Sequence, residues 1–349
     1  MSEKTGNAVI IKVIIDGKPF DFLFDTGAMI SLISKEAAGK AKYLEKITIT
    51  DNLGHDQKHN TVKKNVLIND IEFKDIGFAI MDFSHINQNS CLQIDGIFGA
   101  NAIKLCNWQI DPSTRRLKLS DVPFSNEITD TPIDLKYHAG LLPLVSTTLN
   151  NANFLMLLDT GDDGLISLNR ESYKNTVPEQ VKAISGEGVY KGTFNSLLKE
   201  KIEKVELKKI QIGTQQVANV QAIVSNDKSA IGYRFLQDYI TTINTEVNKL
   251  YLKPITQKDI ANTGAFDINF CRNEQDELII CFIWDKSALK ASGLNVGDKV
   301  VMFNGTRLEK LSDEQYCMIK EHIRALESIT IKIRQGKQEK AYNLIKSEF

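Results

Sequence analysis

Two aspartates occupy matching positions and could form a reactive pair of carboxyl groups. Asp25 ends the apolar run Phe22–Phe24, Asp159 ends the apolar run Leu155–Leu158, and both are followed by Thr-Gly. A carboxylate at the end of a buried strand is costly unless it is paired or hydrogen-bonded. Two adjacent carboxyl groups cannot both ionise cheaply, so they share one proton. The ionised member can then take a proton from a water molecule while the protonated member polarises a carbonyl group.

The surroundings of the two aspartates predict an internal repeat of about 120 residues. Each Asp-Thr-Gly is followed, at nearly the same distance, by an apolar-apolar-Gly element, Ile97–Gly99 in the first copy and Ala230–Gly232 in the second. Leu32–Ser34 in the first copy likewise resembles Leu165–Ser167 in the second. A two-copy repeat indicates two lobes related by a pseudo-twofold axis, each with one aspartate.

These elements resemble the two-lobed aspartic peptidases of the pepsin and retropepsin kind, over roughly residues 1 to 254. The resemblance implies that Asp25 and Asp159 are the catalytic pair and that they hydrolyse peptide bonds without a covalent enzyme intermediate, a metal or a cofactor. With both aspartates in one chain, the cleft would be complete in a monomer. The residues expected to support the pair are Thr26, Gly27, Thr160 and Gly161.

Asp162 departs from the pattern of these peptidases, which usually have Ser, Thr or Ala after Asp-Thr-Gly. Ala28 conforms in the first copy. An additional acid at this position should raise a pKa of the aspartate pair or distort the loop if it points inward, and should change little if it points outward.

A covering hairpin is expected over the pair in each copy. In the first copy it would lie around the polar turn Asp51–Asp56. In the second copy it would lie at Ser185–Gly192, where three glycines would make the tip pliable.

The composition changes at about Ile255, where a third unit is expected. The run Ser287–Val300, continued by Asn304-Gly305, resembles PDZ domains of the bacterial protease-associated type. Ser312 and Gln315 have the spacing of a capping box that opens a helix. PDZ domains take an extended peptide as an added strand, with loop amides holding its terminal carboxylate.

The best candidate for that loop has an acid where glycine is usual. A carboxylate there would repel the carboxylate of a peptide C-terminus, so binding of internal peptides or a role between the lobes remains equally open. The residues of the expected loop are Gly264, Ala265, Phe266, Asp267 and Ile268.

The expected fold is mainly β. Two pseudo-symmetric β-barrel lobes like those of acid proteases should occupy residues 1–121 and 122–254, with residues 120–132 as the link between them. A PDZ domain, a small β-sandwich with capping helices, should follow at residues 255–349.

The overall composition limits which classes of partner and which cellular compartments are expected. A net charge of −1 gives no general attraction to nucleic acid, and no apolar segment reaches the roughly 18 residues of a membrane span. The five cysteines are odd in number and lack Cys-x-x-Cys spacing, so ordinary thiols are expected. The first residues lack a signal-peptide layout, which fits a cytoplasmic protein or one whose export signal was removed; in the second case the resemblance favours the periplasm or cell envelope.

Three functional hypotheses follow. The first is an aspartic endopeptidase that cleaves extended polypeptides, with the PDZ domain binding or steering peptide. The second is a catalytically weak or inactive homologue that acts as a peptide-binding module. The third is an interaction scaffold in which both Asp-Thr-Gly copies are structural turns. Carboxyl groups within hydrogen-bond reach of one another would favour catalysis, whereas carboxyl groups far apart or paired with lysine would favour a scaffold.

Overall fold

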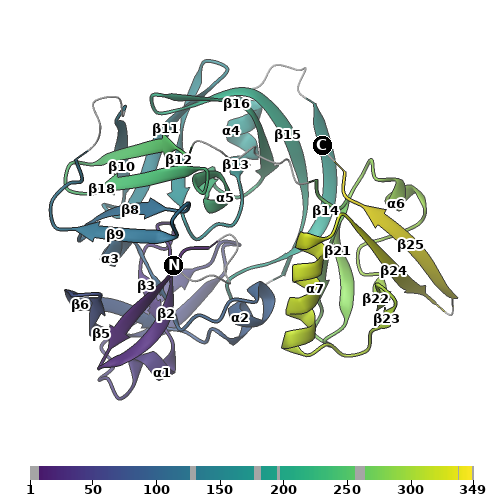
Figure 1. Ribbon diagram of the computed structural model, residues 1–349, viewed down its shortest axis with the longest axis horizontal. Coiled ribbons are helices and arrows are strands. Elements are labelled where there is room, and N and C mark those ends of the chain that lie inside the picture. The colour runs from purple at the N-terminus through teal and green to yellow at the C-terminus, as the bar shows by residue number, and fades with distance from the viewer. Residues whose placement is uncertain are drawn as a thin grey trace. The chain divides into compact units, whose positions relative to one another are not determined.

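Strands dominate the chain (Figure 1). The computed structural model describes residues 8–125, 131–176, 182–194, 197–255, 264–336 and 338–347. Strand accounts for 53% of the structure and helix for 13%, which confirms the mainly β class. Within the expected link and the expected start of the third domain, residues 126–130 and 256–263 lie outside the described residues.

The chain divides into two compact units. The first unit comprises Met1–Ser84, Leu92–Lys182 and Lys204–Gln257, and the second comprises His85–Cys91, Ala183–Glu203 and Lys258–Phe349.

Six strands of the first unit close into a barrel (Figure 1). Their order is β1-β2-β7-β3-β6-β5, and β5 closes the barrel on β1 where Ile14 lies opposite Leu67. A further strand, β4, pairs with β5 as a hairpin, where a covering hairpin is expected. The strands are β1 (Ile10–Ile15), β2 (Lys18–Phe24), β3 (Ser31–Ile33), β4 (Lys46–Thr50), β5 (Asp56–Ile68), β6 (Ile71–Ile80) and β7 (Gly96–Phe98).

A cluster of buried aromatic side chains includes Phe24, the residue just before the first Asp-Thr-Gly. The ring of Phe24, the residue before Asp25, lies 4.9 Å from that of Trp108, and Phe73 stacks on Trp108 at 5.9 Å. The buried indole N–H of Trp108 donates to the carbonyl of Ile103 at 2.6 Å. Burial of such large rings is the main favourable term in folding a barrel of this size, and it holds β2 rigidly beneath the loop that follows it.

The pairings of the first barrel recur among later strands of the chain. The pairs β1–β2, β2–β7, β3–β7, β3–β6 and β1–β5 are matched by β11–β12, β12–β17, β13–β17, β13–β16 and β11–β15. Asp25 follows β2 and Asp159 ends β12, so both aspartates leave corresponding strands. The later strands are β11 (Leu142–Leu149), β12 (Ala152–Asp159), β13 (Ile166–Asn169), β15 (Leu197–Ile212), β16 (Gln215–Ser225) and β17 (Ala230–Gly232).

One antiparallel sheet joins the two sets of strands, in the order β9-β8-β18-β19-β10. At its centre β8 pairs with β18, and the side-chain amide of Gln109 donates to the hydroxyl of Thr242 at 3.1 Å. The strands are β8 (Asn107–Asp111), β9 (Arg116–Ser120), β10 (Ile133–His138), β18 (Tyr239–Asn244) and β19 (Lys249–Pro254). Short helices flank the strands of the first unit: α1 (Lys35–Ala38), α3 (Ala100–Ile103), α4 (Arg170–Lys174) and α5 (Tyr233–Leu236).

The second unit packs a curved sheet against one long helix, α7. Its buried core includes Phe266, Ile280, Phe303, Tyr316 and Ile331. Its elements are α2 (Ser84–Ser90), β14 (Ala183–Lys191), β20 (Ile268–Arg272), β21 (Leu278–Trp284), α6 (Ala288–Ala291), β22 (Lys299–Phe303), β23 (Thr306–Arg307), α7 (Asp313–Ala325), β24 (Ser328–Gln335) and β25 (Gln338–Ile345).

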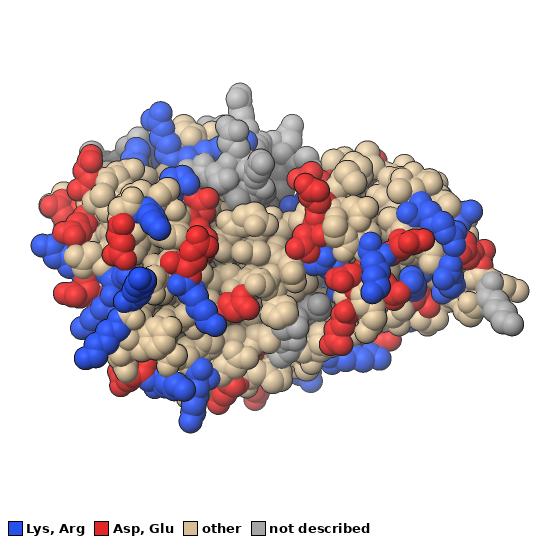
Figure 2. Space-filling view, turned by 90° about the horizontal axis from the view of Figure 1, so that it is seen from below, with Lys and Arg blue, Asp and Glu red and all other residues tan. Residues whose placement is uncertain are grey.

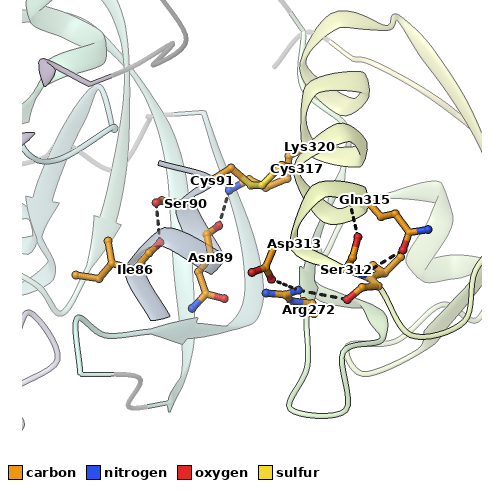
Figure 3. Close-up of a disulfide and its surroundings, with 11 residues drawn as sticks. Ile86, Asn89, Ser90, Cys91, Arg272, Ser312, Asp313, Gln315, Cys317 and Lys320 are labelled. Carbon is orange, nitrogen blue, oxygen red and sulfur yellow. Dashed lines mark hydrogen bonds and ion pairs between the residues drawn. A yellow bond between two sulfur atoms is a disulfide. The ribbon is translucent and has the colours of Figure 1, made fainter. Parts of the chain in front are cut away.

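The capping box at the start of α7 is confirmed. The hydroxyl of Ser312 accepts the Gln315 amide at 3.2 Å, and the Gln315 side chain accepts the Ser312 amide at 3.0 Å (Figure 3).

Two glycines of the second expected hairpin lie in a paired strand and not at a hairpin tip. Gly186 and Gly188 lie within β14, which pairs with β21 of the same unit. A Cβ atom would lie 2.4 Å from the ring of Phe282 at Gly186 and 2.5 Å from it at Gly188. The prediction of a pliable tip is therefore wrong for these two residues, because their missing side chains allow close packing between strands.

A disulfide joins Cys91, just after α2, to Cys317 in α7 (Figure 3). The prediction that all five cysteines are thiols is therefore wrong for this pair, whereas Cys106, Cys271 and Cys281 keep their thiols. The bond closes a sequence separation of 226 residues, which no local spacing can reveal.

Basic and acidic side chains are interspersed on the face of the molecule in Figure 2, without an extended field of one sign. Within the described ranges, no helix is both long and apolar enough to cross a membrane.

Candidate active site

The two Asp-Thr-Gly loops meet through reciprocal hydrogen bonds between their threonines. The amide of Thr26 donates to the hydroxyl oxygen of Thr160 at 3.1 Å, and the amide of Thr160 donates to that of Thr26 at 3.0 Å. Each hydroxyl then donates across to the other loop, Thr26 to the carbonyl of Leu158 at 2.5 Å and Thr160 to that of Phe24 at 2.7 Å. Both threonines are buried, so these bonds form in a medium where an unmade bond is costly.

The glycines bring each carboxyl group against the opposite loop. A Cβ atom at Gly27 would lie 2.2 Å from Oδ2 of Asp159, and one at Gly161 would lie 2.3 Å from Cγ of Asp25. Neither position has room for a side chain. The structure thus places all six residues of the two expected Asp-Thr-Gly sets in one site.

Each carboxyl group is held by amides of its own loop. Oδ1 of Asp25 accepts the amides of Gly27 at 2.8 Å and Ala28 at 3.0 Å. Oδ1 of Asp159 accepts the amides of Gly161 at 3.1 Å and Asp162 at 3.2 Å. These bonds fix both carboxyl groups in equivalent orientations, as expected for groups related by a pseudo-twofold axis.

The environment makes Asp25 a weak acid. Burial and then the negative charge of Asp159 raise the pKa of Asp25 to about 7, against the opposing effects of the loop amides and Lys228. Asp25 therefore keeps its proton through the mildly acidic range, whereas an ordinary aspartate is ionised there.

Asp162 lies close enough to the pair to interact with it. Its Oδ1 accepts the amide of Gly164 at 2.8 Å, which folds the loop back on itself. Burial, together with the charges of Asp159 and Asp163, raises the pKa of Asp162 to about 6. The repulsion that was expected between this additional acid and the pair therefore appears as a raised pKa of Asp162.

Lys228 is a member of the site that sequence reasoning missed. Its ammonium Nζ lies 3.4 Å from Oδ2 of Asp159, and 47% of its side chain is exposed. It lies just before β17, the strand that pairs in parallel with the one leading into Asp159. The repeat gives no signal for it, because Asp95 precedes the equivalent strand β7 in the first copy and accepts the backbone amide of Asp21.

The loop expected to bind a peptide carboxylate lies in the second unit and is bonded to Ser347, two residues after the last strand. The amide of Ala265 donates to the carbonyl of Ser347 at 3.1 Å, and the carboxylate of Asp267 accepts the hydroxyl of Ser347 at 2.9 Å. Phe266 is buried in the core. The amide of Ala265 is therefore already engaged within the protein.

The loop leads into β20, and a cavity of about 720 Å³ lies beside this strand. Residues of β20 and α7 form part of its walls. Phe270, Phe282, Tyr316 and Ile323 give it an apolar lining. Among its cations, the guanidinium of Arg272 is already paired with Asp313 at 2.7 Å (Figure 3). The cavity thus suits a largely apolar ligand.

No cluster of His, Cys, Asp and Glu suited to hold a metal ion is found among the residues that the structure describes.

Comparison with protein families gives a match for part of the chain. Residues 11–104 match the family described as gag-polyprotein putative aspartyl protease, a range that includes Asp25, Thr26 and Gly27. This match supports an aspartyl protease-like domain with a β-barrel. No significant match is found among curated proteins.

Proposed function

We propose that the chain is an aspartic endopeptidase with a two-lobed catalytic unit, whose catalytic pair is Asp25 and Asp159. The family match supports a peptidase function in general. The observation that carries the finer proposal is the reciprocal bonding of Thr26 and Thr160, with Gly27 and Gly161 each against the opposite aspartate. Structural turns in a scaffold need neither the shared hydrogen bonds nor two carboxyl groups brought so close together.

The surroundings of the two carboxyl groups indicate which of them acts as the base and which as the acid. Asp159, beside Lys228, is the ionised member and takes a proton from a water molecule. Asp25 holds its proton and donates a hydrogen bond to the carbonyl oxygen of the scissile peptide bond. Attack of the water, with transfer of the Asp25 proton to the carbonyl oxygen, gives a tetrahedral diol. Asp159 then passes the proton that it took from the water to the leaving nitrogen, a diol hydroxyl returns a proton to Asp25, and the C–N bond breaks. The two carboxyl groups end the cycle with one proton between them, as they began.

The second unit is proposed to be a PDZ domain that binds extended peptide in the cavity beside β20 and α7. The engaged amide of Ala265 and the carboxylate of Asp267 favour internal segments over free C-termini.

Cleavage of a denatured protein substrate between about pH 3 and pH 7 tests the peptidase proposal. Wild type should cleave, and both Asp25→Asn and Asp159→Asn should lose activity. Asp134→Asn is a matched control, because Asp134 pairs with Lys249 on the exposed surface of the same unit. Full activity in either variant of the catalytic pair would exclude a shared catalytic role.

The second candidate is a peptide-binding module without cleavage. The additional acid Asp162 beside the pair and the carboxylate of Asp267 in the expected peptide loop are the features that favour it. Fluorescence anisotropy with a labelled denatured substrate distinguishes the two. Retained binding without cleavage at any pH would establish the module, whereas turnover would exclude it.

A further inference from the structure

The two Asp-Thr-Gly loops are nearly equivalent in their hydrogen bonds, yet their charged neighbours differ. Each aspartate accepts two amides from its own loop, and the threonine bonds are reciprocal. In the first loop the neutral Ala28 follows Asp-Thr-Gly. In the second loop an acid, Asp162, follows it, and a cation, Lys228, faces the aspartate. The difference in charge around the two carboxyl groups therefore comes from the second copy, through Asp162 in its loop and Lys228 just before β17.

A symmetric pair has no preferred place for its single proton. Among the described residues, Asp162 repels Asp159, and Asp163 in turn repels Asp162. Lys228 attracts Asp25 and lies beside Asp159. In the described part of the chain, Lys228 is the cation that acts on both Asp25 and Asp162, and it lies within ion-pair distance of Oδ2 of Asp159. An opposite charge at this distance stabilises the ionised form of a carboxyl group.

We propose that Lys228 is a positioning residue that fixes the roles of the pair, holding Asp159 as the ionised base and leaving the proton on Asp25. The inference rests on the proposed catalytic pair and assigns a different role to each member. Lys228 also offsets the charge of Asp162, and this allows a third carboxyl group to lie beside the pair. Because the lysine side chain is half exposed, its influence should weaken with rising ionic strength.

Titration of the carboxyl groups by NMR of protein with ¹³C-labelled aspartate tests the assignment without requiring cleavage. Asp25→Asn leaves Asp159 as the remaining member of the pair, and Asp159→Asn leaves Asp25, so neither variant has a coupled pair. Adding Lys228→Met should move the titration of the remaining carboxyl group to higher pH, and by more in the Asp25→Asn background than in the Asp159→Asn background. Lys249→Met, which removes a surface ion pair of the same unit, should move neither titration. An equal shift of both, a larger shift of Asp25, or no shift would overturn the proposal.

The pH profile of kcat/KM gives a second readout once wild type is found to cleave. Lys228→Met should move both limbs of the profile to higher pH, because the cation favours loss of each proton. Lys228→Arg should restore the wild-type profile, and added salt should move the limbs of wild type but not of Lys228→Met. A uniform loss of activity with unmoved limbs would indicate a purely structural lysine and overturn the proposal. Absence of cleavage by wild type would overturn the peptidase function alone, since the NMR titration still decides the role of Lys228.

Discussion

Thr26 and Thr160 exchange hydrogen bonds, each backbone amide donating to the other's hydroxyl oxygen, at 3.1 and 3.0 Å. Each hydroxyl in turn donates to a carbonyl of the strand that leads into the opposite aspartate. Four hydrogen bonds made by two buried threonines, two of them with each other, therefore hold the two loops in one arrangement. The positions of Asp25 and Asp159 relative to each other depend directly on this contact.

Replacing either threonine by valine should weaken the fold and the activity together. Valine keeps the shape but leaves a buried amide and a buried carbonyl without partners, which should lower the free energy of unfolding by about 1–3 kcal/mol. Cleavage should fall by at least about tenfold, because the carboxyl groups lose their fixed geometry. Thr26→Ser and Thr160→Ser keep the hydroxyl and serve as controls. Urea unfolding and kcat/KM measure both effects, and a valine variant that matches its serine control would contradict the prediction.

Gly161→Ala should abolish cleavage, because the new methyl group would lie 2.3 Å from Cγ of Asp25 and must displace it. We expect a fall in kcat/KM of at least about a hundredfold. Gly77→Ala is the matched control, since Gly77 lies in the same unit and a Cβ atom there meets nothing within 4 Å. Comparable activity in the two variants would show that Asp25 can move without consequence for catalysis.

The sequence predicts the strands that carry the aspartates and the contact between the loops, because these depend on a local motif that occurs twice. Phe22–Phe24 and Leu155–Leu158 are apolar runs that read as buried strands, and both are strands ending at the site. The capping box at Ser312 is likewise local, and it is found as predicted. The catalytic role of these residues stays a prediction.

Features that depend on residues far apart in the sequence could not be predicted. Lys228 has no counterpart in the first copy, where Asp95 occupies the equivalent position, so the repeat gives no reason to select it. Cys91 and Cys317 lie 226 residues apart among an odd number of cysteines. The packing of Gly186 and Gly188 against Phe282 depends on a strand distant in sequence, whereas glycine in isolation suggests a flexible turn.

The stability of the first unit should decrease as pH rises from about 4 to about 7 because of Asp25. Its pKa is about 7 in the folded chain and near 3.8 when unperturbed, so the folded state retains a proton that the unfolded state has lost. Stability is then greatest below the lower pKa and levels off above the higher one. Urea midpoints measured across this range should fall for wild type, and the fall should be smaller for Asp25→Asn. If the urea midpoints of wild type and Asp25→Asn changed with pH in the same way, the raised pKa of Asp25 would be contradicted.

Asp162→Asn should leave the fold intact and move the pH profile of cleavage to lower pH. The amide oxygen of asparagine can still accept the amide of Gly164, so the loop keeps its shape. Loss of the negative charge beside Asp159 removes a repulsion that disfavours ionisation of the pair. The direction is opposite to that expected for Lys228→Met, and kcat/KM measured across the pH range checks it. An unchanged profile would show that the charge of Asp162 does not reach the pair.

Reduction of the disulfide between Cys91 and Cys317 should destabilise the second unit. The bond joins two segments of that unit far apart in sequence, and native disulfides of this kind contribute roughly 2–5 kcal/mol. Thiol counting in denaturant should find three free thiols before reduction and all five cysteines after it. The double variant Cys91→Ser/Cys317→Ser should unfold like the reduced protein and be insensitive to a dithiol reductant. Five reactive thiols in protein purified without reductant would contradict the bond, whereas a count of three supports maturation in an oxidising compartment.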